Sequence, residues 1–257
     1  MNKIIIIGAN SYIARNMLYI LNACDNTCEI KLYDREDNHK DGDVRYEKID
    51  ILDTDSVEKI DFDCDIIYMF IGKTGSSEGF LNYNLFIDVN ERGLLNVLNI
   101  YVKKCSKAKI VFPSTRLVYK GSSCELIENA EKEFNTIYAI NKFACEQYLK
   151  MYNKVYGLRY SIMRICIPYG TMIKNASSYG TAEFMLSKAK SGTNITLYGD
   201  GKLRRTIVHM NDLCKILYLG GISNECVNDV YNIGGEDYSL FEMAKLIAEK
   251  YGVGIDY

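Results

Sequence analysis

Short apolar runs alternate with longer stretches of helical periodicity through the first two thirds of this 257-residue chain. Ile4–Ile7 is an unbroken run of β-branched residues, which is typical of a strand buried on both faces. Strands that alternate with helices predict right-handed βαβ units and a parallel sheet. The strands predicted in this way are Ile4–Ile7, Glu29–Tyr33, Val44–Ile49, Asp65–Ile71, Lys109–Pro113 and Tyr160–Ile165, and the helices are Tyr12–Leu21, Leu85–Lys104 and Tyr138–Tyr156.

The alternation loosens after Pro168, where the pattern predicts a smaller lobe. Its predicted elements are a helix at Thr181–Lys190, a strand at Ile195–Tyr198, a strand-and-helix unit at Thr206–Leu219 and a helix at Leu240–Tyr251. We therefore predict an α/β fold in which a doubly wound parallel sheet spans residues 1–165 and a small interleaved C-terminal lobe spans 166–257, with 206–232 returning to the sheet. A substrate is expected between the two parts.

Composition excludes several classes of protein. The net charge is −2 and no block of Lys or Arg occurs, so we expect no nucleic-acid partner. Because no apolar run reaches about 18 residues and the first residues are too short for a signal segment, we predict no membrane span and a cytoplasmic location. Nine cysteines without a C-x-x-C pair, and only two histidines, predict no metal site.

The first strand runs directly into Gly8-Ala9-Asn10-Ser11-Tyr12-Ile13-Ala14, which opens the first helix. This context favours a phosphate site, because a helix N-terminus offers N–H groups and positive potential. A dinucleotide turn carries glycines where this chain has Ser11 and Ala14. Alanine is tolerated at the last position. The side chain of Ser11 hinders the close approach of the backbone to the pyrophosphate, but its hydroxyl can hydrogen-bond a phosphate oxygen. Taken alone, an ordinary strand-to-helix corner remains an alternative.

Asp34 stands at the end of the second strand, where a dinucleotide site carries an acid that accepts hydrogen bonds from both ribose hydroxyls. A carboxylate there repels a 2′-phosphate and favours NAD over NADP, although Arg35 weakens the preference. The alternative is a turn residue at the end of a strand.

Tyr138 and Lys142 lie four residues apart, which places the phenol and the ammonium on one helix face. The unperturbed pKa of tyrosine is about 10, so a tyrosine base near neutral pH needs a nearby cation. Ser114 and Thr115 follow the fifth strand, at the edge of the sheet where open α/β folds bind ligands. A hydroxyl there can hold a substrate oxygen while Tyr138 moves the proton. The spacing alone is weak, since Tyr198 and Lys202 repeat it in a turn.

The order of these motifs resembles the extended short-chain dehydrogenase/reductase family, in its NAD-dependent sugar-nucleotide epimerase/dehydratase branch, from Ile4 to about Tyr251. The resemblance implies a Rossmann fold with an NAD-binding domain at 1–165 and a substrate-binding lobe at 166–257. Its further motifs are Asp50-Ile51 beside the adenine, Phe70–Lys73 after the fourth strand, Asn90 and Gly93 in a helix, Arg205–His209 with a phosphate-binding arginine, and Tyr231–Gly235 near the C-terminus.

The resemblance also implies the site residues. The catalytic residues are Thr115, Tyr138 and Lys142, with Lys142 also binding the nicotinamide ribose. The cofactor contacts are Gly8, Asn10, Ser11, Tyr12, Ile13, Asp34, Asp50, Ile51, Phe70, Ile71, Gly72, Lys73, Asn90, Ser114, Tyr138 and Lys142. The substrate contacts are Thr115, Arg116, Tyr169 and Arg205. A homodimer through the Leu85–Lys104 and Tyr138–Tyr156 helices is implied as well.

The expected activity is that of an NAD-dependent sugar-nucleotide oxidoreductase, first a 4-epimerase. Dehydratases of the family carry Asp-Glu after the active-site threonine, whereas Arg116-Leu117 stand here and disfavour dehydration. Ile167 replaces an asparagine that many members have on the diphosphate side of the substrate. Two alternatives stay open: an NAD(P)H-dependent reductase of 4-keto-deoxysugar nucleotides, and a non-catalytic nucleotide-sensing protein on the same fold. We also predict that the N–H or hydroxyl of Ser11 faces the pyrophosphate.

Overall fold

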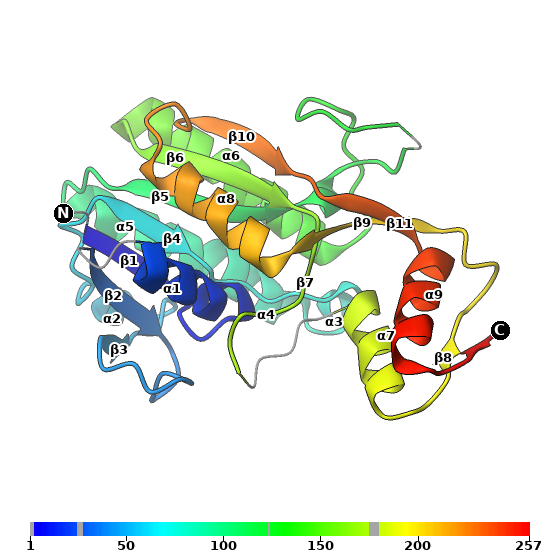
Figure 1. The fold of residues 1–257 in the computed structure, drawn as a ribbon. Helices are drawn as coiled ribbons and strands as arrows, with labels where there is room; N and C mark the ends of the chain where they lie inside the picture. Colours follow the sequence, from blue (N-terminus) through cyan, green and yellow to red (C-terminus); the bar gives the residue numbers. More distant parts are fainter. Residues whose placement is uncertain (1–2, 25–27, 123, 175–179) are drawn as a thin grey trace.

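Seven parallel strands form the central sheet of the computed structural model, which describes residues 3–24, 28–122, 124–174 and 180–257 (Figure 1). In spatial order they are β10 (Asp229–Ile233), β6 (Arg159–Ile165), β5 (Lys109–Thr115), β4 (Ile66–Met69), β1 (Lys3–Ile7), β2 (Glu29–Asp34) and β3 (Tyr46–Lys48). The direction of strand succession reverses between β1 and β4, where doubly wound sheets bind ligands. The predicted fold class, a Rossmann-type parallel sheet, is confirmed.

Helices cover both faces of this sheet. In Figure 1, α1 (Tyr12–Cys24) and α8 (Met210–Ile222) cross the near face, where they pack against each other. The other face is covered by α2 (Thr54–Val57), α5 (Gly93–Lys103) and α6 (Ile137–Tyr156), with α3 (Ser76–Leu81), α4 (Tyr83–Ile87) and a π-helical turn at Asp88–Arg92 leading into α5. The described helices include none that is long and apolar enough to cross a membrane.

The apolar run of β1 feeds both layers of the core. Ile4 and Ile6 join the cluster under α1 and α8, whereas Ile5 and Ile7 join the cluster under α5 and α6. All four are at most 1% exposed, because successive side chains of a strand point to opposite faces. The uninterrupted hydrophobicity of this segment therefore reflects burial on two sides.

The C-terminal part contains two small sheets. One holds β11 (Glu236–Ser239), β9 (Arg204–His209) and β7 (Ile167–Tyr169), and the other pairs β12 (Ile255–Asp256) with β8 (Ile195–Thr196). Helices α7 (Thr181–Lys190) and α9 (Leu240–Tyr251) pack together around a third apolar cluster. The chain returns to the central sheet through β10, which pairs with β6. The domain boundary after residue 165 remains a prediction.

Several predicted bounds differ from the observed ones. The third strand is three residues long instead of Val44–Ile49, because Val44 is 96% exposed and has no sheet partner. The helix predicted at Leu85–Lys104 is interrupted by the π-helical turn. The fifth strand extends two residues further, so Ser114 and Thr115 are its last residues. The pattern missed the short elements α2, α3, β7, β10, β11 and β12, which are too brief for a period to show.

Candidate active site

A cavity of about 380 Å³ opens at the carboxyl ends of β1, β4, β5 and β6. It brings together most residues of the predicted catalytic centre and of the predicted phosphate turn. Its lining residues are Ser11, Tyr12, Ile13, Phe70, Ile71, Gly72, Thr74, Pro113, Ser114, Thr115, Arg116, Leu117, Tyr138, Lys142, Ile165, Cys166, Ile167 and Pro168. The charged side chains in this list are Arg116 and Lys142, which are both cationic.

The turn after β1 is tight and depends on Gly8. Its φ is +87°, a region that L-residues with side chains rarely adopt. A Cβ at this position would lie 2.5 Å from the carbonyl oxygen of Phe70. The Gly8 N–H donates to the Tyr33 carbonyl at 2.8 Å, which ties the turn to the end of β2. The backbone of the turn therefore lies against β4 and β2 without room for a side chain.

Ser11 serves the helix as well as the cavity. Its hydroxyl oxygen accepts from the Ala14 N–H at 3.3 Å, and its own N–H donates to the Gly8 carbonyl at 3.0 Å. The serine thus caps the first turn of α1, whose N-terminus faces the cavity through Ser11, Tyr12 and Ile13. Since the N–H is engaged, the hydroxyl proton is the part of Ser11 that remains for a pyrophosphate oxygen. That contact stays a prediction.

Asp34 is linked to the same turn. One carboxylate oxygen accepts from the Asn10 N–H at 2.9 Å, and the other accepts from the Arg35 N–H at 2.7 Å. Asn10 is 5% exposed, and its side-chain amide bonds the carbonyl of Asn38 and the N–H of Lys40. Each oxygen of Asp34 keeps a lone pair for a ribose hydroxyl. Asn10 therefore orients the acid, and its side chain is already used for the following loop.

Lys142 is 4% exposed and lies in the wall of the cavity. Its ammonium donates to the carbonyl oxygen of Pro113 at 2.9 Å and to that of Ile71 at 3.4 Å. It also lies 4.4 Å from the centre of the Phe112 ring. Desolvation by burial lowers the pKa of Lys142 to about 8, while the neighbouring Cys145 and Glu146 act in the opposite direction. Two backbone carbonyls thus fix the position of the ammonium, and its lowered pKa makes its protonation depend on nearby charges.

Tyr138 precedes Lys142 by one helical turn and lines the same cavity. Thr136 caps this helix by accepting from the Ala139 N–H at 3.1 Å, which sets the start of the helix just before the tyrosine. Desolvation raises the pKa of Tyr138 above its ordinary value, and a hydrogen bond with Thr115 opposes that rise. Thr115 also accepts from the Leu117 N–H at 3.2 Å. The phenol and the threonine hydroxyl therefore lie together at the cavity.

A buried ionic network lies behind these residues. Glu146 follows Lys142 by one turn of α6 and is 0% exposed. Its carboxylate accepts from the Ser114 hydroxyl at 2.5 Å and from two nitrogens of Arg164 at 2.9 and 2.6 Å. Arg164 also donates to the hydroxyl of Tyr119 at 2.6 Å. The network ties α6 to the last residues of β5 and to β6. Ser114, a predicted cofactor contact, reaches the cavity but gives its proton to Glu146.

Asn90 lies in the π-helical turn and fixes the segment after β4. Its side-chain oxygen accepts from the Lys73 N–H at 2.7 Å, and its amide donates to the Lys73 carbonyl at 3.1 Å. Such π-helical turns are frequent at functional sites, since they displace one residue from the regular helix. Asn90 and Lys73 therefore lie beside the cavity wall, which Gly72 lines.

The remaining predicted contacts lie outside the lining of the cavity. Asp50 and Ile51 follow β3, and a Cβ on Gly93 would lie 2.4 Å from the Ile51 side chain. Arg205 lies on β9 and Tyr169 on β7, where the tyrosine ring packs 5.3 Å from that of His209. Burial and the nearby cation of Arg205 lower the pKa of Arg116. Arg116 thus lines the cavity within electrostatic range of Arg205 on β9.

The types of group present fit a dinucleotide. A pyrophosphate requires a turn without side chains and a helix N-terminus, which Gly8 and the start of α1 at Ser11 provide. A ribose diol requires a carboxylate, which stands at the end of β2, and the second ribose requires a donor such as the buried ammonium of Lys142. Among the residues that the structure describes, no three His, Cys, Asp or Glu side chains gather as a metal site would need.

The sequence reasoning missed Glu146 and the apolar wall of the cavity. Glu146 continues the stripe of Tyr138 and Lys142 at four-residue spacing, so the helical pattern contained a signal for it. The wall at Ile165, Cys166 and Pro168 comes from the end of β6 and the turn into β7. Nothing in a single apolar residue distinguishes a cavity wall from the core.

Residues 4–234 match the family model described as "NAD dependent epimerase/dehydratase family". The chain belongs to this family, which confirms the resemblance seen in its motifs. One relative is a Methanocaldococcus jannaschii protein with a provisional assignment as a UDP-glucose 4-epimerase, 27% identical over 79% of this chain and 67% of its own length. Another is the CDP-paratose 2-epimerase of Salmonella typhi, 26% identical over 72% of this chain and 62% of its own length. The chain thus spans about two thirds of these relatives.

Solved structures agree with the fold. The UDP-glucose 4-epimerase of Thermus thermophilus, determined as a complex with NAD, superposes with a TM-score of 0.86 at 22% identity. The match covers 99% of this chain and 85% of that one. At this level of identity the similarity shows the fold alone.

Proposed function

We propose that the chain is an NAD-dependent enzyme of sugar-nucleotide metabolism that inverts C4 of the sugar. The observation that carries the proposal is the convergence of Thr115, Tyr138 and Lys142 on one cavity, together with the N-terminus of α1. Relatives named as 4-epimerases support the same reaction, although other relatives are named as decarboxylases and a dehydratase. Arg116 and Leu117 stand after Thr115, where a dehydratase would need acidic residues.

The cofactor would be held by the Gly8 turn and Ser11 at the pyrophosphate, by Asp34 at the adenosine ribose and by Lys142 at the other ribose. The chemistry that NAD supplies when bound is the reversible acceptance of a hydride. The repulsion of a 2′-phosphate by Asp34 supports NAD as the preferred form.

The residues of the chain would manage the proton. Tyr138 takes the proton of the sugar 4-hydroxyl and later returns it, while the Thr115 hydroxyl hydrogen-bonds the reacting oxygen. Burial, and to a lesser extent the nearby Cys145, raises the pKa of Tyr138, so the phenol becomes a base only when positive charge approaches it. Lys142 already supplies one such charge one helical turn away.

Inversion requires that the sugar turn over between the two half-reactions. Part of the cavity wall is apolar, at Ile165, Ile167 and Pro168, and the side chains there offer no directional bond to hold one face of the sugar. The nucleotide must then be held elsewhere, for which Arg205 on β9 is suited.

Tyr138→Phe tests the proposal. We expect the conversion of UDP- and dTDP-hexoses, followed by NMR, to fall by about 10²–10⁴-fold, since a proton-transfer group is lost. Tyr152→Phe is the matched control: it lies on the same helix, bonds Asn99 at 2.5 Å and is not part of the cavity wall. Unchanged turnover in Tyr138→Phe would show that the assignment of the base is wrong.

A spectrum of the purified protein separates epimerase from reductase. An epimerase regenerates its cofactor in each cycle, so we expect tightly bound NAD(H) to copurify. An empty protein that consumes added NADPH with a 4-keto-sugar nucleotide would instead establish the reductase.

A further inference from the structure

Arg116 is a partly buried arginine that takes no part in the proposed proton transfer. It follows Thr115 directly and lines the cavity beside Tyr138. Among the described residues, no carboxylate forms an ion pair with Arg116 or with Arg205. Arg204 shows the contrast, because it is an exposed neighbour that pairs with both Asp237 and Glu242. Arg164 is likewise paired, with Glu146.

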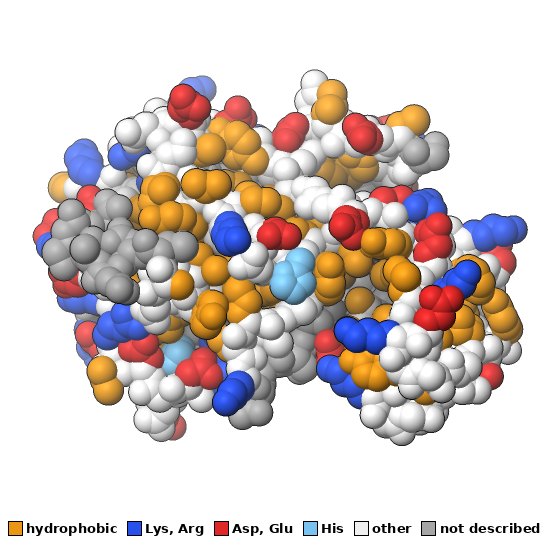
Figure 2. Space-filling view, in the orientation of Figure 1, with side chains coloured by type: hydrophobic (Ala, Val, Ile, Leu, Met, Phe, Trp, Pro, Cys, Tyr) orange, Lys and Arg blue, Asp and Glu red, His pale blue; other side chains and the backbone are white. Residues whose placement is uncertain are grey.

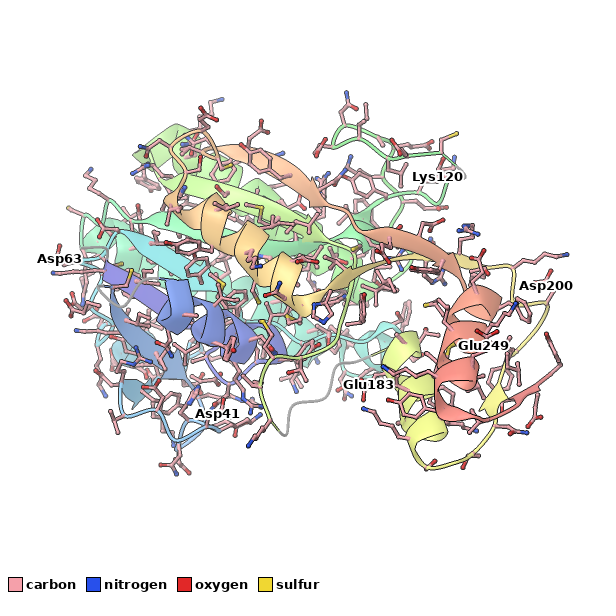
Figure 3. All side chains as sticks on the ribbon, viewed as in Figure 1. Asp41, Asp63, Lys120, Glu183, Asp200 and Glu249 are labelled. Carbon is pink, nitrogen blue, oxygen red and sulfur yellow. The ribbon has the colours of Figure 1, made fainter. Side chains whose placement is uncertain are left out.

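An unpaired guanidinium in a cavity wall implies an anionic ligand. Taking a cation out of water is costly unless a counter-ion replaces the solvent, and here the second nearby charge, Arg205, is also positive. The described lining of the cavity contains no Asp or Glu that could supply that counter-ion. The labelled Asp63 and Asp200 lie at opposite ends of the molecule in Figure 3, and Figure 2 shows acidic and basic groups mixed over one face.

The position of Arg116 in the chain relates it to one part of a sugar. In the proposed reaction Thr115 and Tyr138 hold the oxygen on C4, so the next residue lies near the substituents of the adjoining carbons. C3 carries a neutral hydroxyl, whereas C5 carries C6, which is a carboxylate in a hexuronate. The diphosphate is attached to C1, across the ring from C4.

We infer that Arg116 binds the C6 carboxylate of the sugar and that the substrate class is therefore a nucleotide hexuronate. This inference rests on the proposed function. The planar guanidinium matches a carboxylate with two parallel hydrogen bonds, a geometry that a neutral CH₂OH group cannot satisfy. A neutral hexose would leave the cation of Arg116 desolvated and unpaired in the closed site.

The test compares UDP-glucuronate with UDP-glucose, in binding by calorimetry and in turnover by NMR. We expect wild-type protein to bind the uronate more tightly. Arg116→Met should reduce the ratio of the two affinities by about 10–100-fold, the range for one hydrogen-bonded charge pair. Arg116→Lys keeps the positive charge but cannot form two parallel hydrogen bonds with a carboxylate, and it should reduce the ratio of affinities less than Arg116→Met does. Arg204→Met, the neighbouring paired arginine outside the cavity, should leave the ratio unchanged, and the unfolding temperature of each variant verifies folding.

Three possible results distinguish failure of this inference from failure of the proposed function. If wild-type protein binds UDP-glucose as tightly as UDP-glucuronate, the inference is overturned while the proposed function stands. If Arg116→Met weakens UDP alone as much as it weakens UDP-glucuronate, Arg116 is a diphosphate ligand and the inference is again overturned. If neither sugar nucleotide binds or is converted, the proposed function fails, and the inference fails with it.

Discussion

The ammonium of Lys142 lies 2.9 Å from the carbonyl oxygen of Pro113, the residue that precedes Ser114 and Thr115 on β5. This hydrogen bond joins the helix that carries Tyr138 to the strand that carries Thr115, as the bond from Ser114 to Glu146 also does. The cation is bound to backbone and ring, without a carboxylate among the hydrogen-bond partners that the described residues provide. It consequently remains a net positive charge at the cavity.

The buried ammonium predicts a dependence of stability on pH. Its pKa is about 8 in the folded protein and 10.5 in the absence of burial, so the unfolded chain binds more protons between these values. The desolvation cost is present in full below about pH 8 and fades as the pH rises toward about 10.5. We expect the unfolding free energy of wild-type protein to rise relative to Lys142→Met across this window, measured by urea denaturation of the ligand-free protein. A flat difference between wild type and Lys142→Met would contradict the prediction.

The ionic network behind the cavity should be a large contributor to stability. Glu146→Gln leaves Arg164 buried without its counter-charge, and we expect a loss of about 3–5 kcal/mol in the free energy of unfolding. Ser114→Ala removes one donor from the same carboxylate but keeps the ion pair, so its loss should be about 1–3 kcal/mol. Denaturant titration measures both. A smaller effect for Glu146→Gln than for Ser114→Ala would show that the pair is less tightly coupled than its distances indicate.

Gly8→Ala should damage both folding and cofactor binding. The left-handed backbone costs about 1–2 kcal/mol for a residue with a side chain, and the added Cβ would also overlap the Phe70 carbonyl. We expect a fall in unfolding temperature and a loss of NAD-induced stabilisation in a thermal-shift assay. Gly234→Ala is the control, because nothing lies within 4 Å of its Cβ position. Equal behaviour of the two variants would contradict the role given to the turn.

Asp34→Asn should relax the choice between NAD and NADP. The amide keeps one oxygen, which can accept from the N–H of Asn10 or of Arg35 but not from both, and it removes the charge that repels a 2′-phosphate, which the Arg35 cation can then attract. We expect the ratio of NADP to NAD affinity to rise at least about tenfold, which is about 1.4 kcal/mol. Calorimetric titration checks this. Asp37→Asn, an exposed acid paired with Lys48 at 2.6 Å, should not alter the ratio.

The long, periodic elements can be predicted from the sequence, and the reason is physical. Ile4–Ile7 is apolar on two buried faces, and α6 has buried residues along one side at helical spacing. The residue types of both segments therefore indicate which side chains are buried. The third strand starts later than its pattern predicts because Val44 is exposed and has no sheet partner, and pairing depends on strands distant in the chain. The short strands β7 and β11 exist only because β9 lies between them.

The candidate site shows the same division. Spacing and position at a strand end predict Tyr138, Lys142 and Thr115, and the structure places all three at one cavity. The hydrogen bonds from Asn10 to the Asn38 carbonyl and from Ser114 to Glu146 could not be predicted, because each joins residues that are distant in the sequence. The cofactor roles of these residues remain predictions.

The pairing of β10 with β6 has a consequence for synthesis of the chain. β6 carries Arg164 and lies between β5 and β10, so its outer hydrogen-bonding edge stays open until Asp229–Ile233 has been made. A nascent chain that ends before this point exposes a buried strand edge, which is a template for aggregation. Completion of the central sheet thus waits until Asp229–Ile233 has been synthesised, long after the other six strands of the sheet.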